Sequence, residues 1–193
     1  MTRRRVLWLG AAGLAALLVP TCVEFAPRLV WNATPSAPIG FYTIEPGAPP
    51  ELGDLVAVTP PPAIERFIVE RGYLGPDMPI LKRVVALPGQ SVCRIDALVT
   101  VDGRPLGAAR ARDGRGRPLP DWQGCRVLQA GEIFLMNPLA VDSLDGRYFG
   151  PLPASAVRGR ARALLTDPDG DGRFHWRADD RELARFFSKG DSR

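Results

Sequence analysis

Apolar residues along this chain gather in short runs that turn-forming residues separate. The run 55–58, for example, follows Gly-Asp and stops shortly before three consecutive prolines. Short β-branched runs bounded by glycine and proline are typical of strands, so the pattern predicts a mostly β protein. We expect strands at 41–44, 55–58, 81–87, 132–136 and 159–166, a hairpin at 92–101 with Asp102-Gly103, and a turn at 148–151.

Two other stretches, 63–72 and 179–188, place their apolar residues on one side at helical spacing. We therefore expect two short amphipathic helices there. The stretch 108–123 differs from both, because it is rich in Arg, Asp and Gly and poor in apolar residues. We expect it to lie exposed, within a loop-rich insertion at about 93–125.

An uncharged, mostly apolar run of 18 residues, 6–23, follows three arginines and ends at Glu24. As a helix rising ~1.5 Å per residue, it would be roughly 27 Å long, which suffices to cross the hydrocarbon core of a bilayer. Basic residues before such a run favour an amino terminus in the cytoplasm and place the rest of the chain outside it.

Residues 1–24 are therefore expected to be an uncleaved signal-anchor, and residues 25–193 one exported domain. A cleaved signal peptide is the alternative, since the apolar run is short. We find no Ala-x-Ala cleavage site between residues 16 and 33. Both interpretations export the body of the protein.

The composition excludes several classes of function. The chain of 193 residues has one His and three Cys, too few for zinc fingers or His-rich metal centres, and we expect neither a metal nor a cofactor. The net charge is +4, of which residues 3–5 supply three charges, so it gives no support to nucleic-acid binding. Only Lys82 and Lys189 are lysines among 25 basic residues, which draws attention to the interior one.

Export also permits disulfides. Cys93 and Cys125 both lie in the exported part, so a bridge between them is expected, with two free thiols as the alternative. Cys22 lies in the apolar run and is expected to be an inert hydrophobic residue.

Three patches carry candidate chemistry: Ser-Ala-Pro-Ile-Gly-Phe-Tyr at 36–42, Lys-Arg-Val-Val-Ala-Leu-Pro-Gly at 82–89, and Ser-Leu-Asp-Gly-Arg-Tyr-Phe-Gly-Pro at 143–151. In this order they resemble the sequence boxes of type I signal peptidases. The Ser-x-Pro-x-Gly-x-Tyr opening is most similar to the TraF group of conjugative-transfer peptidases. The resemblance implies a signal-peptidase-like or LexA-like β-fold catalytic domain.

The residues themselves suit a serine and lysine pair. A serine hydroxyl needs a base to become a good nucleophile, and in a chain with one His a lysine is the available alternative. A lysine amine is a base only when neutral, and burial lowers its pKa from about 10.4. Lys82 precedes the apolar run 84–87, which suits a buried amine. We expect Ser36 to be the nucleophile and Lys82 its base.

The resemblance implies further roles in the same site. The backbone N–H of Ser36 and the hydroxyl of Thr34, two residues earlier, would hold the oxyanion. Ser143 would bond the amine of Lys82 and orient it.

Asp145 and Arg147 resemble the family's Asp-x-Arg pair, which stabilises the residues around the catalytic ones. Gly146 stands between them, where the family usually has Ser. Asp142 is the alternative to Asp145 in the supporting role.

These expectations combine into a membrane-anchored serine endopeptidase in the cytoplasmic (inner) membrane, with its catalytic domain in the periplasm. The TraF resemblance implies a pilin precursor as substrate and a role in conjugative transfer or type IV secretion, with secretion components as partners. Cleavage by hydrolysis and by ring closure both stay open. The alternatives are a housekeeping signal peptidase I and a non-catalytic periplasmic assembly subunit.

Three other signals are given less weight. Residues 167–172 alternate carboxylates as a calcium loop does, but Ala178 stands at the twelfth position, where an EF-hand needs Glu. His175 is expected to be partly buried rather than a catalytic base. The arginines at 110, 112, 115 and 117 are expected to form a solvated face, with contact to anionic lipid or a partner protein as the alternative.

Overall fold

The computed structural model describes residues 28–178 and four single residues before them, 4, 5, 8 and 13. The expected anchor at 1–24, with Cys22, otherwise lies outside the described residues, and so does the expected helix at 179–188. Within the described part of the chain, no helix has the length and apolar character that crossing a bilayer requires.

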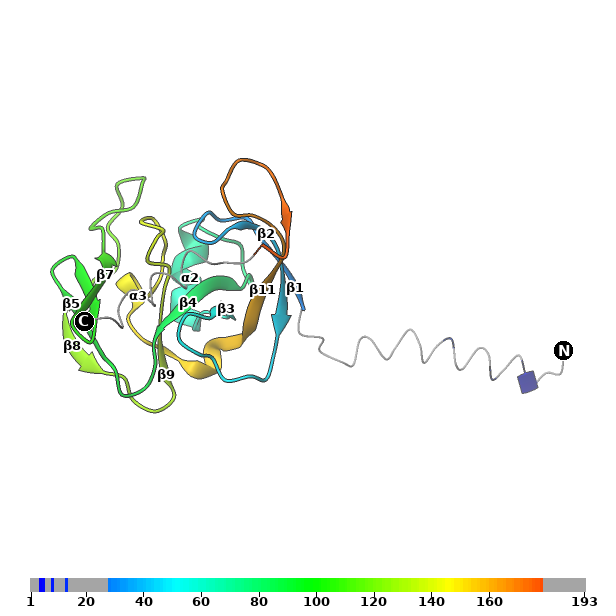
Figure 1. Ribbon diagram of the computed structural model, residues 1–193, viewed down its shortest axis with the longest axis horizontal. Coiled ribbons are helices and arrows are strands. Elements are labelled where there is room, and N and C mark those ends of the chain that lie inside the picture. The colour runs from blue at the N-terminus through cyan, green and yellow to red at the C-terminus, as the bar shows by residue number, and fades with distance from the viewer. Residues whose placement is uncertain (1–3, 6–7, 9–12, 14–27, 179–193) are drawn as a thin grey trace.

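The described residues are mostly β, as the pattern predicted. A large sheet of eight strands follows the order β1-β2-β11-β3-β4-β9-β10, and β12 pairs with β11 (Figure 1). Neighbouring strands are antiparallel throughout. These strands are β1 (Leu29–Asn32), β2 (Ile39–Glu45), β3 (Leu55–Val58), β4 (Ile80–Ala86), β9 (Glu132–Met136), β10 (Leu152–Pro153), β11 (Val157–Asp167) and β12 (His175–Trp176).

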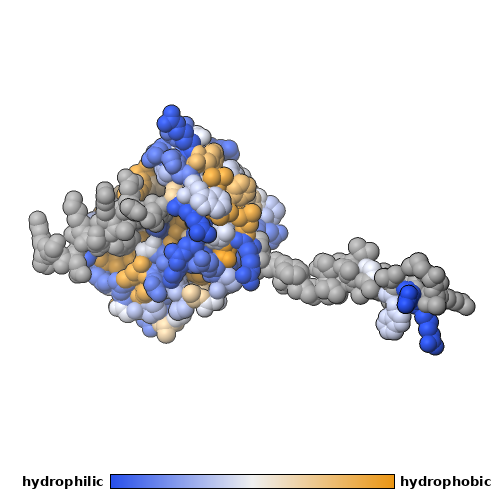
Figure 2. All heavy atoms as spheres, turned by 45° about the vertical axis from the view of Figure 1, so that its right-hand side comes forward, coloured by the Kyte–Doolittle hydropathy of each residue, from blue (hydrophilic) through white to orange (hydrophobic). Residues whose placement is uncertain are grey.

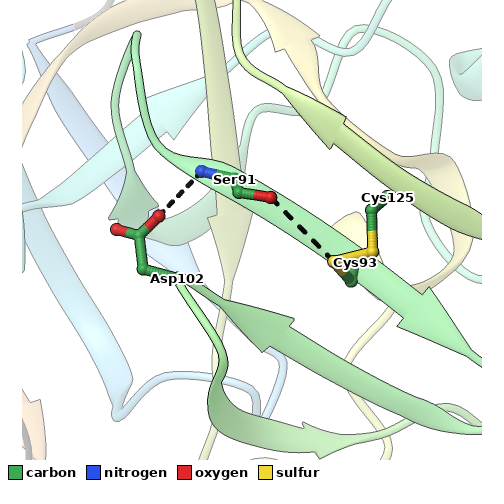
Figure 3. Close-up of a disulfide and its surroundings, with 4 residues drawn as sticks. All are labelled: Ser91, Cys93, Asp102 and Cys125. Carbon is green, nitrogen blue, oxygen red and sulfur yellow. Dashed lines mark hydrogen bonds between the residues drawn. A yellow bond between two sulfur atoms is a disulfide. The ribbon is translucent and has the colours of Figure 1, made fainter.

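A second sheet of four strands has the order β7-β6-β5-β8 and lies at the opposite end of the described domain from β1 (Figure 1). Cys93 and Cys125 face each other in its β5–β8 ladder and form a disulfide with an S–S distance of 2.03 Å (Figure 3). The strands are β5 (Ser91–Ile95), β6 (Leu98–Val101), β7 (Arg104–Ala108) and β8 (Gly124–Val127).

This sheet corrects the expectation of a loop-rich insertion at about 93–125. Only 109–123, between β7 and β8, lacks regular strands. The expected hairpin also turns earlier, because β5 ends before Asp96, whose φ is 53°. Asp102, with φ 49°, begins a second turn that leads into β7. Aspartate tolerates this left-handed backbone better than most residues, so two turns replace one.

The helices are short. The expected helix at 63–72 is α2 (Pro62–Glu70), and a 3₁₀ turn spans Ala154–Ala156. The turn expected at 148–151 overlaps a single helical turn, α3 (Gly146–Phe149), which includes its first two residues. Asp145 makes this possible, because its carboxylate accepts the backbone N–H of Arg147 and caps the helix.

Strand β4 is buried along its whole length and joins the two parts of the core. Its inner residue Val85 packs with Val92 and Val99 of the small sheet. On the opposite side of the strand, Ile80 and Val84 belong to a cluster formed with β3 and β9. Alternate residues of a strand share a face, so Lys82 projects from the same side as these two aliphatic residues.

The surface in Figure 2 mixes hydrophilic and apolar residues rather than presenting one continuous apolar face. The exposed aromatic side chains include Trp31, whose ring centroid lies 4.7 Å from that of Phe41 and 6.1 Å from that of Phe174. His175 is exposed, which corrects the expectation of partial burial.

The acidic loop after β11 is held by hydrogen bonds between one carboxylate and the backbone of the loop. The carboxylate of Asp167 accepts the N–H groups of Gly170, Asp171 and Gly172. Within the described residues no group of three or more His, Cys, Asp or Glu side chains is placed to hold a metal ion. Of the arginines at 110–117, Arg117 pairs with Asp113 instead of facing only solvent.

Candidate active site

Ser36 lies in the loop between β1 and β2, and a buried asparagine shapes that loop. The side-chain amide of Asn32 donates to the carbonyl oxygens of Thr34, Ala37 and Pro38 at 2.9, 2.9 and 3.0 Å. Its oxygen accepts the N–H and the hydroxyl of Thr34 at 3.2 and 2.9 Å. The hydroxyl of Thr34 therefore lies 3.3 Å from that of Ser36.

The other residues of the first patch fix where this loop meets the sheet. The hydroxyl of Tyr42 donates to the carbonyl of Pro38 at 2.8 Å. Gly40, with φ 145°, lies so close to β11 that a Cβ there would be 2.2 Å from the carbonyl oxygen of Leu165. Only glycine permits this approach, so the Ser-x-Pro-x-Gly-x-Tyr spacing has a structural cause.

Lys82 reaches the loop from the middle of β4. Only 5% of the residue is exposed, and its neighbour across the ladder is the fully buried Val56. The amine Nζ donates to Ser143 Oγ at 2.9 Å and to Ser36 Oγ at 3.3 Å. The three polar groups thus meet at one point, although they come from positions 46 and 61 residues apart in sequence.

Ser143 is held by the buried ion pair that follows it. Arg147 donates to both carboxylate oxygens of Asp145, through Nε at 2.9 Å and Nη2 at 2.8 Å. The two side chains are 1% and 0% exposed. Arg147 also donates to the carbonyls of Asn137 and Ala140, at 3.0 and 2.6 Å, and so fixes the loop that carries Ser143.

Gly146 departs from the family pattern for a steric reason. A Cβ at this position would lie 2.6 Å from the ring of Phe134 and 2.7 Å from the carbonyl oxygen of Leu135. A serine therefore does not fit without moving β9. Asp142, the alternative to Asp145, pairs with Arg110 at the surface instead.

The electrostatics of the site favour a neutral amine. Burial lowers the pKa of Lys82 from 10.5 to about 8. The charge of Asp145 opposes this shift and that of Arg147 adds to it. A lysine with such a pKa is neutral in a substantial fraction of molecules near pH 8, and the neutral amine can accept a proton.

Two cavities meet at Ser36. One, of about 390 Å³, also contains Thr34 and Lys82 and has apolar walls that include Ile68, Leu74 and Ile80. The other, of about 590 Å³, lies against Pro38, Tyr42, Asn137 and Thr166. A chain that crosses Ser36 would therefore find space on both sides of it.

The structure brings Thr34, Ser36, Lys82, Ser143, Asp145 and Arg147 together, and places the Cys93–Cys125 disulfide in the small sheet. Two asparagines that the sequence did not mark as site residues, Asn32 and Asn137, bond the backbone around Ser36. The available signal was an asparagine just before or at the start of a proline-containing loop.

Comparisons with known proteins show the family of the chain. Residues 2–166 match the family described as signal peptidase, peptidase S26. The chain therefore belongs to the peptidase S26 signal peptidase family.

Within that family its relatives include conjugation proteins. It is 39% identical over 182 residues to the conjugal transfer protein TraF of Agrobacterium fabrum, covering 87% of this chain and 100% of the relative. It is 33% identical over 114 residues to a probable signal peptidase I-1 of Synechocystis, covering 58% and 53%. A crystal structure of a signal peptidase I from Enterococcus faecalis is similar with a TM-score of 0.35 and 18% identity, covering 60% of this chain and 98% of that one.

Proposed function

We propose that this chain is a serine endopeptidase in which Ser36 is the nucleophile and Lys82 the general base. The observation that carries the proposal is the buried amine of Lys82, within hydrogen-bond reach of the hydroxyls of Ser36 and Ser143. A buried amine with a lowered pKa beside a serine hydroxyl is the arrangement that lysine-based activation of serine requires.

The proposed reaction begins when neutral Lys82 takes the proton of Ser36 Oγ as that oxygen attacks the scissile carbonyl. The backbone N–H of Ser36 and the hydroxyl of Thr34 stabilise the oxyanion. The resulting ammonium of Lys82 then gives its proton to the leaving amine, the C–N bond breaks, and an ester on Ser36 remains. In the second half a water molecule, or an amine, attacks this ester while neutral Lys82 takes its proton. The ester C–O bond then breaks, and Lys82 returns the proton to Ser36 Oγ.

The substrate we propose is an exported precursor protein, with a conjugative pilin precursor preferred. Support comes from the match to TraF, which extends over the whole of that relative, whereas the signal peptidase relative is covered only to about half. We also propose that residues 1–24 anchor the chain in the cytoplasmic membrane, with residues 25–193 as the periplasmic peptidase domain, which would place Ser36 where exported precursors emerge.

A cleavage assay tests the proposal. The full chain in detergent is incubated with a pilin precursor and, separately, with a generic secretory precursor, each against Ser36→Ala. We expect cleavage by the parent, none by folded Ser36→Ala, and faster cleavage of the pilin precursor. Equal cleavage by Ser36→Ala would refute the nucleophile, and preference for the secretory precursor would favour a housekeeping signal peptidase. If folded parent cleaves neither precursor, a non-catalytic assembly role is favoured.

The rate of cleavage should depend on pH in the direction that a basic lysine dictates. Because the pKa of Lys82 is about 8, its neutral fraction falls as pH decreases below that value. We expect kcat/KM to fall about tenfold for each pH unit below about 7.5 and to level off above about 8.5. Initial rates between pH 6 and 10 measure this, and a profile that is flat from 6 to 9 would contradict lysine as the base.

Thr34 should contribute through its hydroxyl. In the structure this hydroxyl donates to Asn32, so it must turn toward the oxyanion during the reaction. Thr34→Val keeps the shape of the side chain, and we expect it to lower kcat by roughly 10²-fold with little change in KM. Thr34→Ser keeps the hydroxyl and should retain most activity. Equal rates for the valine and serine variants would remove Thr34 from the oxyanion site.

A further inference from the structure

Asn137 begins the loop that leaves β9 after Met136, and it is 4% exposed. Its side-chain Nδ2 donates to the carbonyl oxygen of Ser36 at 2.7 Å and to that of Leu81 at 3.1 Å. Its Oδ1 accepts the backbone N–H of Arg83 at 3.0 Å. One carboxamide therefore contacts the backbone of the proposed nucleophile and the residues on both sides of the proposed base.

This carboxamide makes the two hydrogen bonds to β4 that the next peptide unit of β9 would otherwise make. The β9–β4 ladder begins at the Met136–Arg83 pair, and the chain leaves the sheet at the next residue. In a continuing ladder, the next peptide unit would offer an N–H and a carbonyl to β4. The side chain of Asn137 offers the same two groups to Leu81 and Arg83, so Lys82 is held in β4 although β9 has departed.

The backbone of Asn137 is thereby left for other partners. Its N–H donates to Asp145 Oδ2 at 3.0 Å, and its carbonyl accepts from Arg147 Nη2 at 3.0 Å. This single residue thus joins three segments: the loop of Ser36, the strand of Lys82 and the ion pair behind Ser143.

We propose that Asn137 is a positioning residue, whose carboxamide sets the distance between Ser36 and Lys82. The inference rests on the proposed serine and lysine chemistry. Proton transfer needs Ser36 Oγ and Lys82 Nζ in direct contact, and they lie 3.3 Å apart. Displacement of either by about 1 Å lowers a rate by roughly 10²-fold. The bond from Asn137 to Ser36 joins positions 101 residues apart in sequence, so it acts directly on that separation.

Two variants test this in the full chain with the precursor as substrate. Asn137→Ala removes the carboxamide, and we expect kcat to fall about 30-fold or more with KM within about twofold. Asn137→Asp keeps the shape and the acceptor but loses both N–H donors and adds a carboxylate near Lys82. A nearby negative charge favours the ammonium form, so the acidic limb of the pH–rate profile should also move to higher pH.

Gln90→Ala is the matched control, because Gln90 Oε1 accepts the backbone N–H of Leu87 at 2.9 Å just beyond the far end of β4. It should lose stability and leave kcat and the pH limb unchanged. If Asn137→Ala does not fold, kcat and the pH–rate profile of Asn137→Asp test the inference without it. Rates within threefold of the parent and an unmoved limb in the folded variants would overturn the inference. Cleavage by Ser36→Ala would instead refute the proposed function, so the two failures are distinguishable.

Discussion

Replacing Lys82 with methionine is expected to lower the rate of precursor cleavage by roughly 10⁴-fold, the upper end of the range that a positioned general base contributes. Methionine has a similar length and fills the same apolar surroundings, but it cannot accept the proton of Ser36. His175 is the single histidine of the chain and lies exposed in β12, so we expect no other base to replace the lysine.

The same variant should be more stable than the parent at neutral pH. Burial lowers the pKa of Lys82 in the folded state from 10.5 to about 8, so the unfolded chain binds more protons between these two values. Below pH 8 the buried amine therefore lowers the free energy of unfolding by its full amount, up to roughly 3 kcal/mol. This penalty disappears as pH rises to 10.5.

Urea unfolding and cleavage rates of Lys82→Met, measured on one preparation, check both statements. Lost cleavage together with raised stability at pH 7 would show that the lysine is retained for chemistry rather than for folding. Cleavage within tenfold of the parent by folded Lys82→Met would contradict its assignment as the base.

Breaking the Asp145–Arg147 pair should have the largest effect on stability. Asp145→Asn leaves the charge of Arg147 buried with no carboxylate beside it, in a place where the two side chains are 0% and 1% exposed. Removal of one partner from a buried pair costs about 3–5 kcal/mol, so we expect the free energy of unfolding to fall by that amount. Chemical denaturation with a constant slope against denaturant measures it.

Arg126→Gln provides the matched control for that prediction. Arg126 pairs with Glu132 at 2.6 Å, but the two side chains are 47% and 26% exposed. Such a pair contributes about 1 kcal/mol or less, so its loss should be small. The double variant Asp145→Asn with Arg147→Met should recover part of the loss, because no unpaired charge remains. Equal costs for Asp145→Asn and Arg126→Gln would show that the buried pair does not hold the loop of Ser143.

The strands that could be predicted from sequence are those with a strong local signal. Strands β3 and β9 have the bounds that the sequence predicted, 55–58 and 132–136. Strand β1 was missed because it is a short edge strand next to the apolar run 6–23. The strands β7 and β8 were missed because Gly, Pro and charged residues suggested a loop, whereas pairing with β5 and β6 and a disulfide stabilise them.

In the site, too, residues with a local sequence signal could be predicted and residues that depend on tertiary contacts could not. Ser36 and Lys82 stood out by residue type and by the family's pattern, and the structure places their side chains in contact. Asn32 and Asn137 stand beside proline-containing loops, but their partners could not be predicted, because these are mostly backbone carbonyl and N–H groups whose positions depend on the fold. Gly146 was recognised as a departure, but its cause, the ring of Phe134, is a contact between residues 12 positions apart.

The most direct test of the central claim is the detection of the ester on Ser36. The parent chain and Ser36→Ala are mixed with precursor, quenched in acid within the first turnover and analysed by mass spectrometry. We expect an adduct with the mass of the precursor's amino-terminal acyl segment, located on the peptide that contains Ser36 and absent from Ser36→Ala. Cleaved precursor with no adduct on Ser36, and equal cleavage by Ser36→Ala, would contradict it.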